Sequence, residues 1–279
     1  MVGNPFVDPY SNTIAQFQTW YSHGLLPAPV YQKWFNHCQD PKIYMSEKCK
    51  HYMEDMYVAI GSRINPYGLD YPVCNEDPRI YNSIPDSQIN TPLPISSQVA
   101  TLVNYTAPMR PGDPPFLPDQ DHYRPCAEEH LDRYLNRQDV KAAIHVQPDR
   151  SHHSWKDCSN TIRYSQHDWK TPTIPLYKEL LSMLSEHHIH IFVFSGDDDS
   201  ICSLAGTQTW IWDLGVHPEI GETWKPWKVH NQTAGFVTKF HVQGGSFTFA
   251  TVHGAGHEVP LYRPMEALQL FQNYLTGKW

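Results

Sequence analysis

The chain has 279 residues, which is enough for one large domain or for one domain with an insertion. Its 21 basic and 29 acidic residues give a net charge of -8, and because no basic run occurs, nucleic acid and anionic membranes are poor partners. No stretch approaches the roughly 18 apolar residues of a membrane span, and the 24 prolines indicate a globular body with many fixed loops.

Residues from about 11 to 60 are expected to be helical. An apolar face recurs there at helical spacing, and the stretch Leu26–Pro29 closes it. The members of this face are Ile14, Phe17, Trp20, Tyr21 and Leu25. His51 and Glu54 have the His-x-x-Glu spacing of zinc carboxypeptidases, but no third ligand can be assigned, so we predict no metal site and no cofactor.

The segment from Ser62 to Pro125 is rich in Pro, Asn, Asp and Ser and shows little periodicity, which predicts a surface loop. A loop of this length without regular structure is either functional or mobile. A helix is expected next, over Leu131–Val146, with Val140, Ala143 and Ile144 on its buried side.

Core elements return after Thr171. Pro175 is expected to open a helix that carries Leu176, Leu180 and Leu184 and leads into a buried strand over Ile189–Phe194. A short helix over Thr207–Leu214 should follow, and then three strands of an antiparallel meander over Trp224–Val229, Ala234–Phe240 and Phe247–Val252. A last helix is expected from Pro264, because Met265, Leu268, Phe271 and Leu275 lie at helical spacing. These elements predict an α/β architecture.

Two loops that follow predicted core strands carry groups capable of chemistry. Ser195–Asp199 ends one strand with three adjacent acids, and Gly254–His257 ends a later strand with glycines and an imidazole. In α/β sheets the loops at the carboxyl ends of strands hold catalytic groups. Each loop alone is weak evidence, since three acids also make a solvated turn or part of a calcium loop. The order acid then histidine, however, is the end of the Ser, Asp, His order of α/β-hydrolases.

The residues around these loops resemble one family, the serine carboxypeptidases. Phe194–Cys202 is similar to the aspartate motif of that family, and Thr251–Pro260 is similar to its histidine motif. Further segments agree in the same order along the chain: Gly3-Asn4-Pro5, Asp8-Pro9, Tyr134 to Val140, Ala143 to Val146, Trp155 with Cys158-Ser159, and Pro264 to Phe271. The resemblance implies the α/β-hydrolase fold, release of C-terminal residues from peptides, Asp199 as the catalytic acid and His257 as the catalytic histidine.

The same resemblance implies a division of the chain. Residues 1–10 would be the end of a core strand, residues 11–168 a mainly helical insertion or cap, and residues 169–279 the hydrolase core with both loops. In the family this insertion covers the mouth of the active site. The loop from Ser62 to Pro125 would then shape specificity or be a processing site, with an inert excursion as the equal alternative.

The sequence contains no Gly-x-Ser-x-Gly, the turn that exposes a nucleophilic serine. Gly244-Gly-Ser246 leads into a predicted strand and cannot serve. In the family, the Gly-Asn-Pro segment follows the nucleophile, so the resemblance implies the C-terminal part of such an enzyme. We therefore expect this chain to be inactive alone. Its expected partners are the missing N-terminal half and, as substrates, the C-termini of peptides or proteins.

Six cysteines and two glycosylation sequons, at Asn104 and Asn231, favour the secretory pathway, although no signal peptide follows Met1. The resemblance implies a Cys38–Cys49 disulfide and a Cys74–Cys126 disulfide. It also implies that Cys202 is a free thiol near the substrate and that Cys158 is unpaired here. A Cys158–Cys202 bridge is the alternative that the sequence leaves open.

Glu258, next to the expected catalytic histidine, is also predicted to lie near the substrate, with an exposed loop acid as its alternative. The 17 histidines suggest metal binding, but pairs such as His152-His153 lack grouped carboxylate or thiolate partners, so solvated or core histidines are expected. Two other functions stay open: a non-catalytic binding protein with Asp199 and His257 as relics, and an acyltransferase or lyase on the same scaffold.

Overall fold

The computed structural model describes residues 1–61, 64–73, 123, 127–147, 153–158 and 162–279. These residues belong to two compact units, one formed by Met1–Pro72 with Ser165–Trp279 and the other by Val73–Tyr164. Cys74, Asn104 and Cys126 lie outside the described residues, as does most of the loop predicted after Ser62. The expected boundaries of core and insertion stay a prediction.

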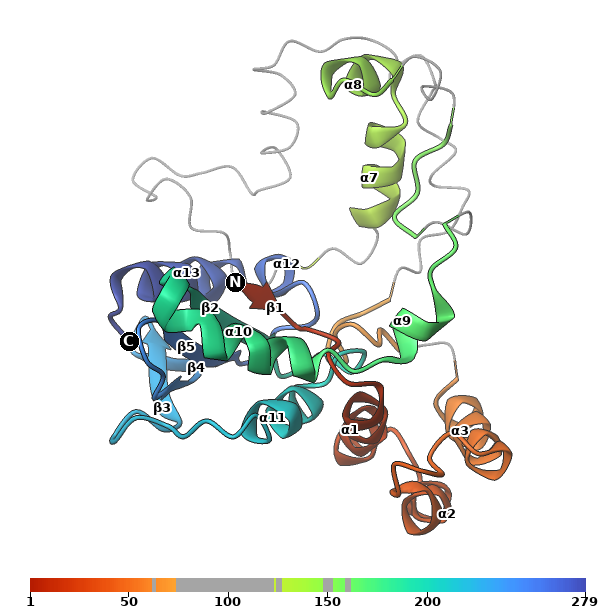
Figure 1. Cartoon of the computed structure of the whole chain (residues 1–279). Helices are drawn as coiled ribbons and strands as arrows, with labels where there is room; N and C mark the ends of the chain where they lie inside the picture. The colour runs from red at the N-terminus through yellow and green to blue at the C-terminus, as the bar shows by residue number, and fades with distance from the viewer. Residues whose placement is uncertain (62–63, 74–122, 124–126, 148–152, 159–161) are drawn as a thin grey trace. The chain divides into compact units, whose positions relative to one another are not determined.

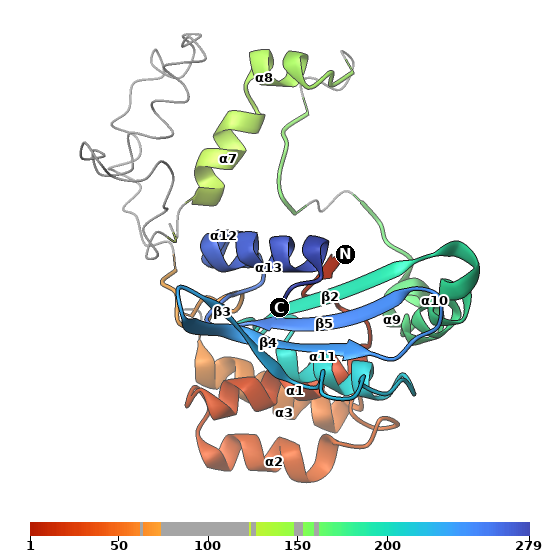
Figure 2. The ribbon, with the colours of Figure 1, turned by 90° about the vertical axis from the view of Figure 1, so that its left-hand side faces the viewer.

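A five-stranded mixed sheet forms the centre of the first unit (Figure 1). In spatial order its strands are β1 (Val2–Gly3), β2 (His190–Gly196), β5 (Ser246–Val252), β4 (Gln232–Phe240) and β3 (Lys225–Val229). The strands β1, β2 and β5 run parallel. The strands β5, β4 and β3 form an antiparallel meander, which confirms the prediction. The parallel part places the ends of three strands at one edge of the sheet, and Figure 2 shows β2, β5 and β4 side by side.

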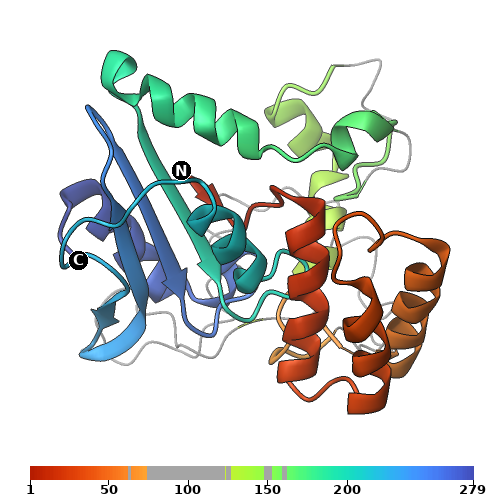
Figure 3. The ribbon, with the colours of Figure 1, turned by 60° about the horizontal axis from the view of Figure 1, so that its bottom comes forward.

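Helices cover both faces of this sheet because the side chains of its central strands alternate. Ile191 and Val193 of β2 join a core cluster with α10 (Ile174–His187) and α11 (Leu204–Trp212), and Figure 3 shows α11 in front of the sheet. Phe192 points to the other face and stacks on Tyr274 of α13 (Pro264–Thr276), with 4.5 Å between ring centroids. The short helix α12 (Val259–Tyr262) precedes α13, and α9 (Gln166–Lys170) precedes α10.

The predicted helical region near the N-terminus is confirmed as α1 (Pro9–Ser22), α2 (Ala28–Cys38) and α3 (Glu47–Ile60). Asp8 caps α1 by accepting a hydrogen bond from the Ser11 amide, and Ser46 caps α3 in the same way from the Cys49 amide. A second core cluster joins the three helices around Phe17, Trp20, Trp34 and Met56. The expected Cys38–Cys49 disulfide links α2 to α3.

The helix predicted over residues 131–146 is wrong in its extent, because the second unit contains two helices there, α7 (Ala127–Leu135) and α8 (Gln138–Ala143). The break falls at Asn136 and Arg137. Asn136 uses its side chain to bind the main chain of Trp155, at 2.9 Å and 2.6 Å, a contact that periodicity cannot reveal. Val140 is buried as predicted, but Ile144 follows the helix and is 58% exposed.

The helices predicted at Pro175 and Pro264 are confirmed as α10 and α13, yet apolar side chains on both remain exposed. These residues are Leu176 and Leu180 on α10, and Leu268, Phe271 and Leu275 on α13. No helix among the described residues is long and apolar enough to cross a membrane.

Candidate active site

The acid loop and the histidine loop lie beside each other because β2 and β5 are neighbouring parallel strands. Gly196 at the end of β2 pairs with Val252 at the end of β5, so the segments Asp197–Asp199 and His253–His257 leave the sheet together. The contact is close: a Cβ on Gly196 would overlap the carbonyl oxygen of Ala255. Glycine at this position therefore allows the two loops to meet.

Asp199 is fully buried and accepts four hydrogen bonds. Its Oδ2 accepts from Nδ1 of His257 at 2.7 Å and from Nδ2 of Asn4 at 2.8 Å. Its Oδ1 accepts from the amides of Ile201 at 2.8 Å and Cys202 at 3.1 Å. These donors come from three separate parts of the chain, and together they fix the orientation of the carboxylate.

His257 is oriented by this carboxylate. The bond to Asp199 assigns the Nδ1 proton, so Nε2 is the ring atom that could exchange a proton with a nucleophile. The side-chain hydrogen bond to Asp199, followed by that to Cys202, raises the pKa of His257 although burial opposes it. The side chain is 30% exposed, so a reacting group can reach the ring.

Asp197 has a separate role from Asp199, although the two are close in sequence. Its carboxylate accepts hydrogen bonds from Nδ1 of His253 at 2.7 Å and from the amide of Gly254 at 2.6 Å. Both donors belong to the histidine loop. Asp197 thus ties the two loops together without touching His257.

Asn4 is a site residue that the sequence analysis did not single out as functional. It follows β1, is buried, and has a positive φ of 41°, a conformation that asparagine tolerates better than most residues. Besides donating to Asp199, its side-chain oxygen accepts from the Gly196 amide at 3.3 Å. Its place within residues 1–10, which the resemblance gives as the end of a core strand, was the signal that could have found it.

Residues Asn65–Tyr71 also reach the site, although the sequence placed them in a surface loop. The carbonyl oxygen of Tyr67 accepts a hydrogen bond from the His257 amide at 2.7 Å, and the two rings lie 5.5 Å apart. Leu69 and Asp70 bind Asp198. The segment contains no helix or strand, but these hydrogen bonds to the site could not be predicted because they are donated or accepted by backbone groups, which leave no mark in residue type.

Cys202 lies beside the two expected catalytic residues. One donor atom each from Asp199, Cys202 and His257 lie within 4.8 Å of one another, and these donor types suit zinc. However, the Asp199 oxygens already accept four hydrogen bonds, and Nδ1 of His257 donates one of them. The group is therefore a satisfied hydrogen-bonding network. Cys202 is a buried free thiol, and Cys158 is an exposed free thiol.

The remaining predicted positions lie on the surface. Glu258 is exposed and precedes α12, and Asn231 is exposed in the two-residue turn between β3 and β4. His51 and Glu54 lie 3.6 Å apart on the exposed side of α3, and no third ligand joins them among the described residues.

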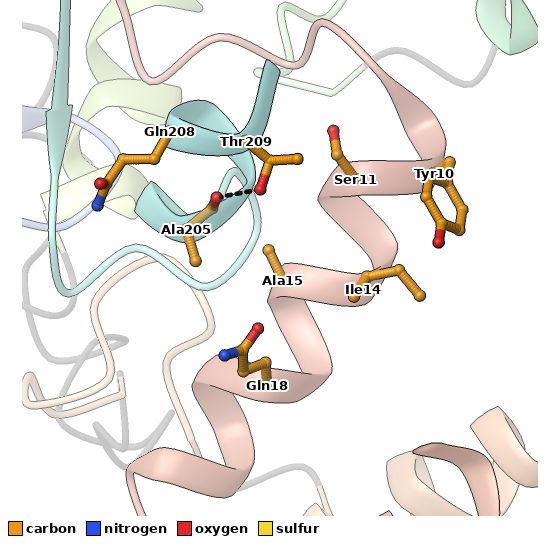
Figure 4. A pocket seen from close by; sticks show the side chains of 8 residues that line it. All are labelled: Tyr10, Ser11, Ile14, Ala15, Gln18, Ala205, Gln208 and Thr209. Carbon is orange, nitrogen blue, oxygen red and sulfur yellow. Dashed lines mark hydrogen bonds between the residues drawn. The ribbon is translucent and has the colours of Figure 1, made fainter. Parts of the chain in front are cut away.

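A separate hollow of about 360 Å³ lies between α1 and α11 (Figure 4). Tyr10, Gln18 and Gln208 are among the residues that line it, and the hydroxyl of Thr209 donates to the carbonyl oxygen of Ala205 at 2.9 Å. Asp199, Cys202 and His257 are not among its lining residues. None of its lining residues is Asp, Glu, His, Lys, Arg or Cys.

Comparison with known proteins agrees with this geometry. A model of the family described as serine carboxypeptidase matches residues 1–277. The chain is 28% identical over 284 residues to serine carboxypeptidase-like 25 of Arabidopsis thaliana and 30% identical over 279 residues to serine carboxypeptidase II-1 of Hordeum vulgare. Both alignments cover 100% of this chain, but 54% of the first protein and 74% of the second, so the chain spans about half the length of the first relative.

A solved structure shows the same fold. Kex1ΔP, a prohormone-processing carboxypeptidase from Saccharomyces cerevisiae, matches with a TM-score of 0.57 at 17% sequence identity, over 99% of this chain and 53% of that one. This likeness identifies the α/β-hydrolase fold, in which the acid and histidine loops follow neighbouring strands as they do here. Since the family model covers nearly every residue, the chain belongs to the serine carboxypeptidase family.

Proposed function

We propose that this chain carries the acid and the base of a serine-type carboxypeptidase, with Asp199 and His257 as two members of a Ser, Asp, His triad. One observation carries the proposal. The fully buried carboxylate of Asp199 accepts a 2.7 Å hydrogen bond from Nδ1 of His257 while the imidazole remains partly exposed. A triad needs its acid and base in this relation.

In this reaction Nε2 of His257 takes the proton of the serine hydroxyl as the oxygen attacks the peptide carbonyl. His257 then gives that proton to the leaving amine, and the acyl-enzyme forms. Water attacks the acyl-enzyme with His257 again as base, and the proton returns to the serine oxygen as the acid is released. Asp199 holds the ring in the required tautomer and stabilises the imidazolium. The substrates are the C-termini of peptides, and Cys202 and Glu258, both adjacent to this ring in space or in sequence, lie near the bound peptide.

We further propose that the nucleophile comes from a segment that precedes residue 1 in the complete protein. Two facts support this: the sequence has no Gly-x-Ser-x-Gly, and β1 is an edge strand of the sheet that the described residues form. Without the nucleophile and its oxyanion hole the chain is inactive alone, because removing the nucleophile from a triad costs on the order of 10⁶ in rate.

The test begins with the gene upstream of the Met1 codon. An in-frame Gly-x-Ser-x-Gly allows the extended protein to be expressed and assayed with a blocked dipeptide. We expect release of the C-terminal residue, loss of most activity in His257→Ala and in Asp199→Ala, and covalent labelling of the new serine by an organophosphate. His253→Ala is the matched control, since its ring binds Asp197 instead of Asp199.

An extended protein that binds the peptide but leaves it intact contradicts the triad and favours a binding protein. Transfer of the acyl group to an alcohol in preference to water favours an acyltransferase.

Export through the secretory pathway is part of this proposal. The Cys38–Cys49 disulfide requires an oxidising compartment in most organisms, and the exposed turn around Asn231 leaves that sequon accessible to glycosylation.

A further inference from the structure

One buried acid has no part in the proton transfers described above. Asp198 is 3% exposed and stands between the two acids of the site. Its carboxylate accepts a hydrogen bond from the Asp70 amide, at 3.0 Å to Oδ2 and 3.3 Å to Oδ1. Its carbonyl oxygen accepts another from the Leu69 amide at 3.1 Å. Asp198 is thus bound through its side chain to Asp70 and through its main chain to Leu69.

Those two residues belong to a segment, Asn65–Tyr71, that we call the strap. Further bonds hold it to the acid loop: the hydroxyl of Ser200 donates to the Pro66 carbonyl oxygen at 2.7 Å, and the Ser200 amide donates to the same oxygen at 3.0 Å. At its end, the hydroxyl of Tyr71 donates to the Gly254 carbonyl oxygen at 2.7 Å. The strap therefore spans the acid loop and the histidine loop.

The strap also holds His257, through the main chain of that residue. The Tyr67 carbonyl oxygen accepts from the His257 amide at 2.7 Å. The preceding residue, Gly256, lies so close that a Cβ there would overlap the same Tyr67 oxygen. The side chain of His257 is thus held by Asp199, and its main chain is held by the strap.

We propose that Asp198 is a positioning residue, which anchors the strap through the Asp70 amide so that Tyr67 holds the backbone of His257 in reach of Asp199. Asp198 does not touch the substrate; it acts through Asp70 and Tyr67. The consequence for catalysis rests on the proposed function, whereas the placement of His257 is a property of this chain and can be measured in it.

The surroundings of Asp198 disfavour the charged form of its carboxyl group. Burial, and then the neighbouring carboxylates of Asp70 and Asp197, raise its pKa to about 6, while the Asp70 amide and the charge of His23 oppose the increase.

The decisive variant is Asp198→Leu, which keeps the shape and removes the acceptor. We expect the His257 amide to exchange its proton about tenfold faster than in the parent chain, the loss of about one hydrogen bond, and the ring resonances of His257 to shift. Asp198→Asn retains an acceptor oxygen and should restore slow exchange. Asp70→Asn is the matched control, because Asp70 donates through its amide; it should behave like the parent.

Unchanged His257 exchange and ring resonances in Asp198→Leu overturn the proposal. If that variant does not fold, native-state exchange of the parent in low urea decides instead. The amides of Leu69, Asp70 and His257 should then open together with one urea dependence, and a His257 amide that stays protected while the other two open overturns the proposal. Neither readout needs activity, so an inactive extended protein refutes the proposed function alone.

Discussion

At the scale of single residues, the bond between Asp199 and His257 has a direct consequence for titration. The folded chain raises the pKa of His257, so the bond stabilises the fold fully below the ordinary histidine pKa near 6.5 and is lost as the pH rises through the folded value. In Asp199→Ala we expect the pKa of His257 to fall by about one to three units. NMR titration of labelled histidine measures it.

The control for this titration is Asp197→Asn, since Asp197 binds His253 and the Gly254 amide. It should alter the resonance of His253 and leave the pKa of His257 raised. An unchanged pKa of His257 in Asp199→Ala would show that Asp199 does not bind the ring in solution.

Asp198 gives the opposite kind of pH dependence. Its pKa is raised from 3.8 to about 6, so the folded state binds the proton more tightly than the unfolded state. The free energy of unfolding therefore falls as the pH rises between these values and then stays level. Asp198→Asn cannot ionise, so from pH 4.5 to 7.5 it should gain about 2 kcal/mol relative to the parent.

Urea unfolding at both pH values measures this difference. The exposed Asp213→Asn serves as the control and should show no such gain. Parallel pH profiles for Asp198→Asn and the parent would contradict the account of a buried charge.

Whether a site residue could be predicted depends on whether its side chain or its main chain makes the contact. Asp199 and His257 follow predicted strands and carry side chains whose types point to proton transfer, so the sequence singled out this pair, and the structure places Nδ1 of His257 2.7 Å from Oδ2 of Asp199. Tyr67 and Asp70 act through a carbonyl oxygen and an amide that every residue has. Their part in the site depends on the path of the backbone, and this appears only in three dimensions.

At the scale of elements, the close approach of the acid and histidine loops makes Gly196 sensitive. A methyl group there would collide with the main-chain oxygens of Ala255 and Gly256, which cannot rotate away. We expect Gly196→Ala to lower the free energy of unfolding by about 1 to 3 kcal/mol and to separate Asp199 from His257. Urea unfolding and the His257 resonances measure both effects.

Gly24→Ala separates collision from backbone preference, because Gly24 has a positive φ but open space around it. It should cost about 1 kcal/mol and leave the His257 resonances unchanged. If Gly196→Ala were as mild as this control, the two loops would be less closely packed in solution than the structure shows.

The elements themselves were largely predictable where apolar periodicity is strong. The meander, the helical region of residues 11–60 and the helices from Pro175 and Pro264 follow from it. The helix over 131–146 was predicted too long because Asn136 satisfies a tertiary contact. The pairing of β1 with β2 could not be derived from periodicity, since two residues are too few to show a period.

At the scale of the whole molecule, one apolar stripe of α13 is exposed among the residues that the structure describes. Leu268, Phe271 and Leu275 lie at spacings of three and four and are 55%, 44% and 65% exposed. Exposed apolar stripes of this kind favour association. We expect the chain alone to self-associate in sedimentation experiments as its concentration rises, and the Leu268→Gln, Leu275→Gln double variant to do so less.

Val58→Gln is the matched control, because Val58 is 81% exposed on α3 and lies away from that stripe. It should leave association unchanged. A chain that stays monomeric over the whole range and unfolds in one sharp, reversible thermal transition would contradict this prediction.

The hydrogen bond between Asn4 and Asp199 has a consequence for the order in which the molecule forms. The two residues are 195 positions apart, and they meet only when β1 joins β2 as a parallel neighbour. Pairings of such long range close slowly, because the intervening chain must lose its freedom first. During synthesis from the N-terminus, Asn4 cannot bind Asp199 until the acid loop has emerged, and His257 emerges later still. We therefore expect the hydrogen bonds around Asp199 to form late in folding.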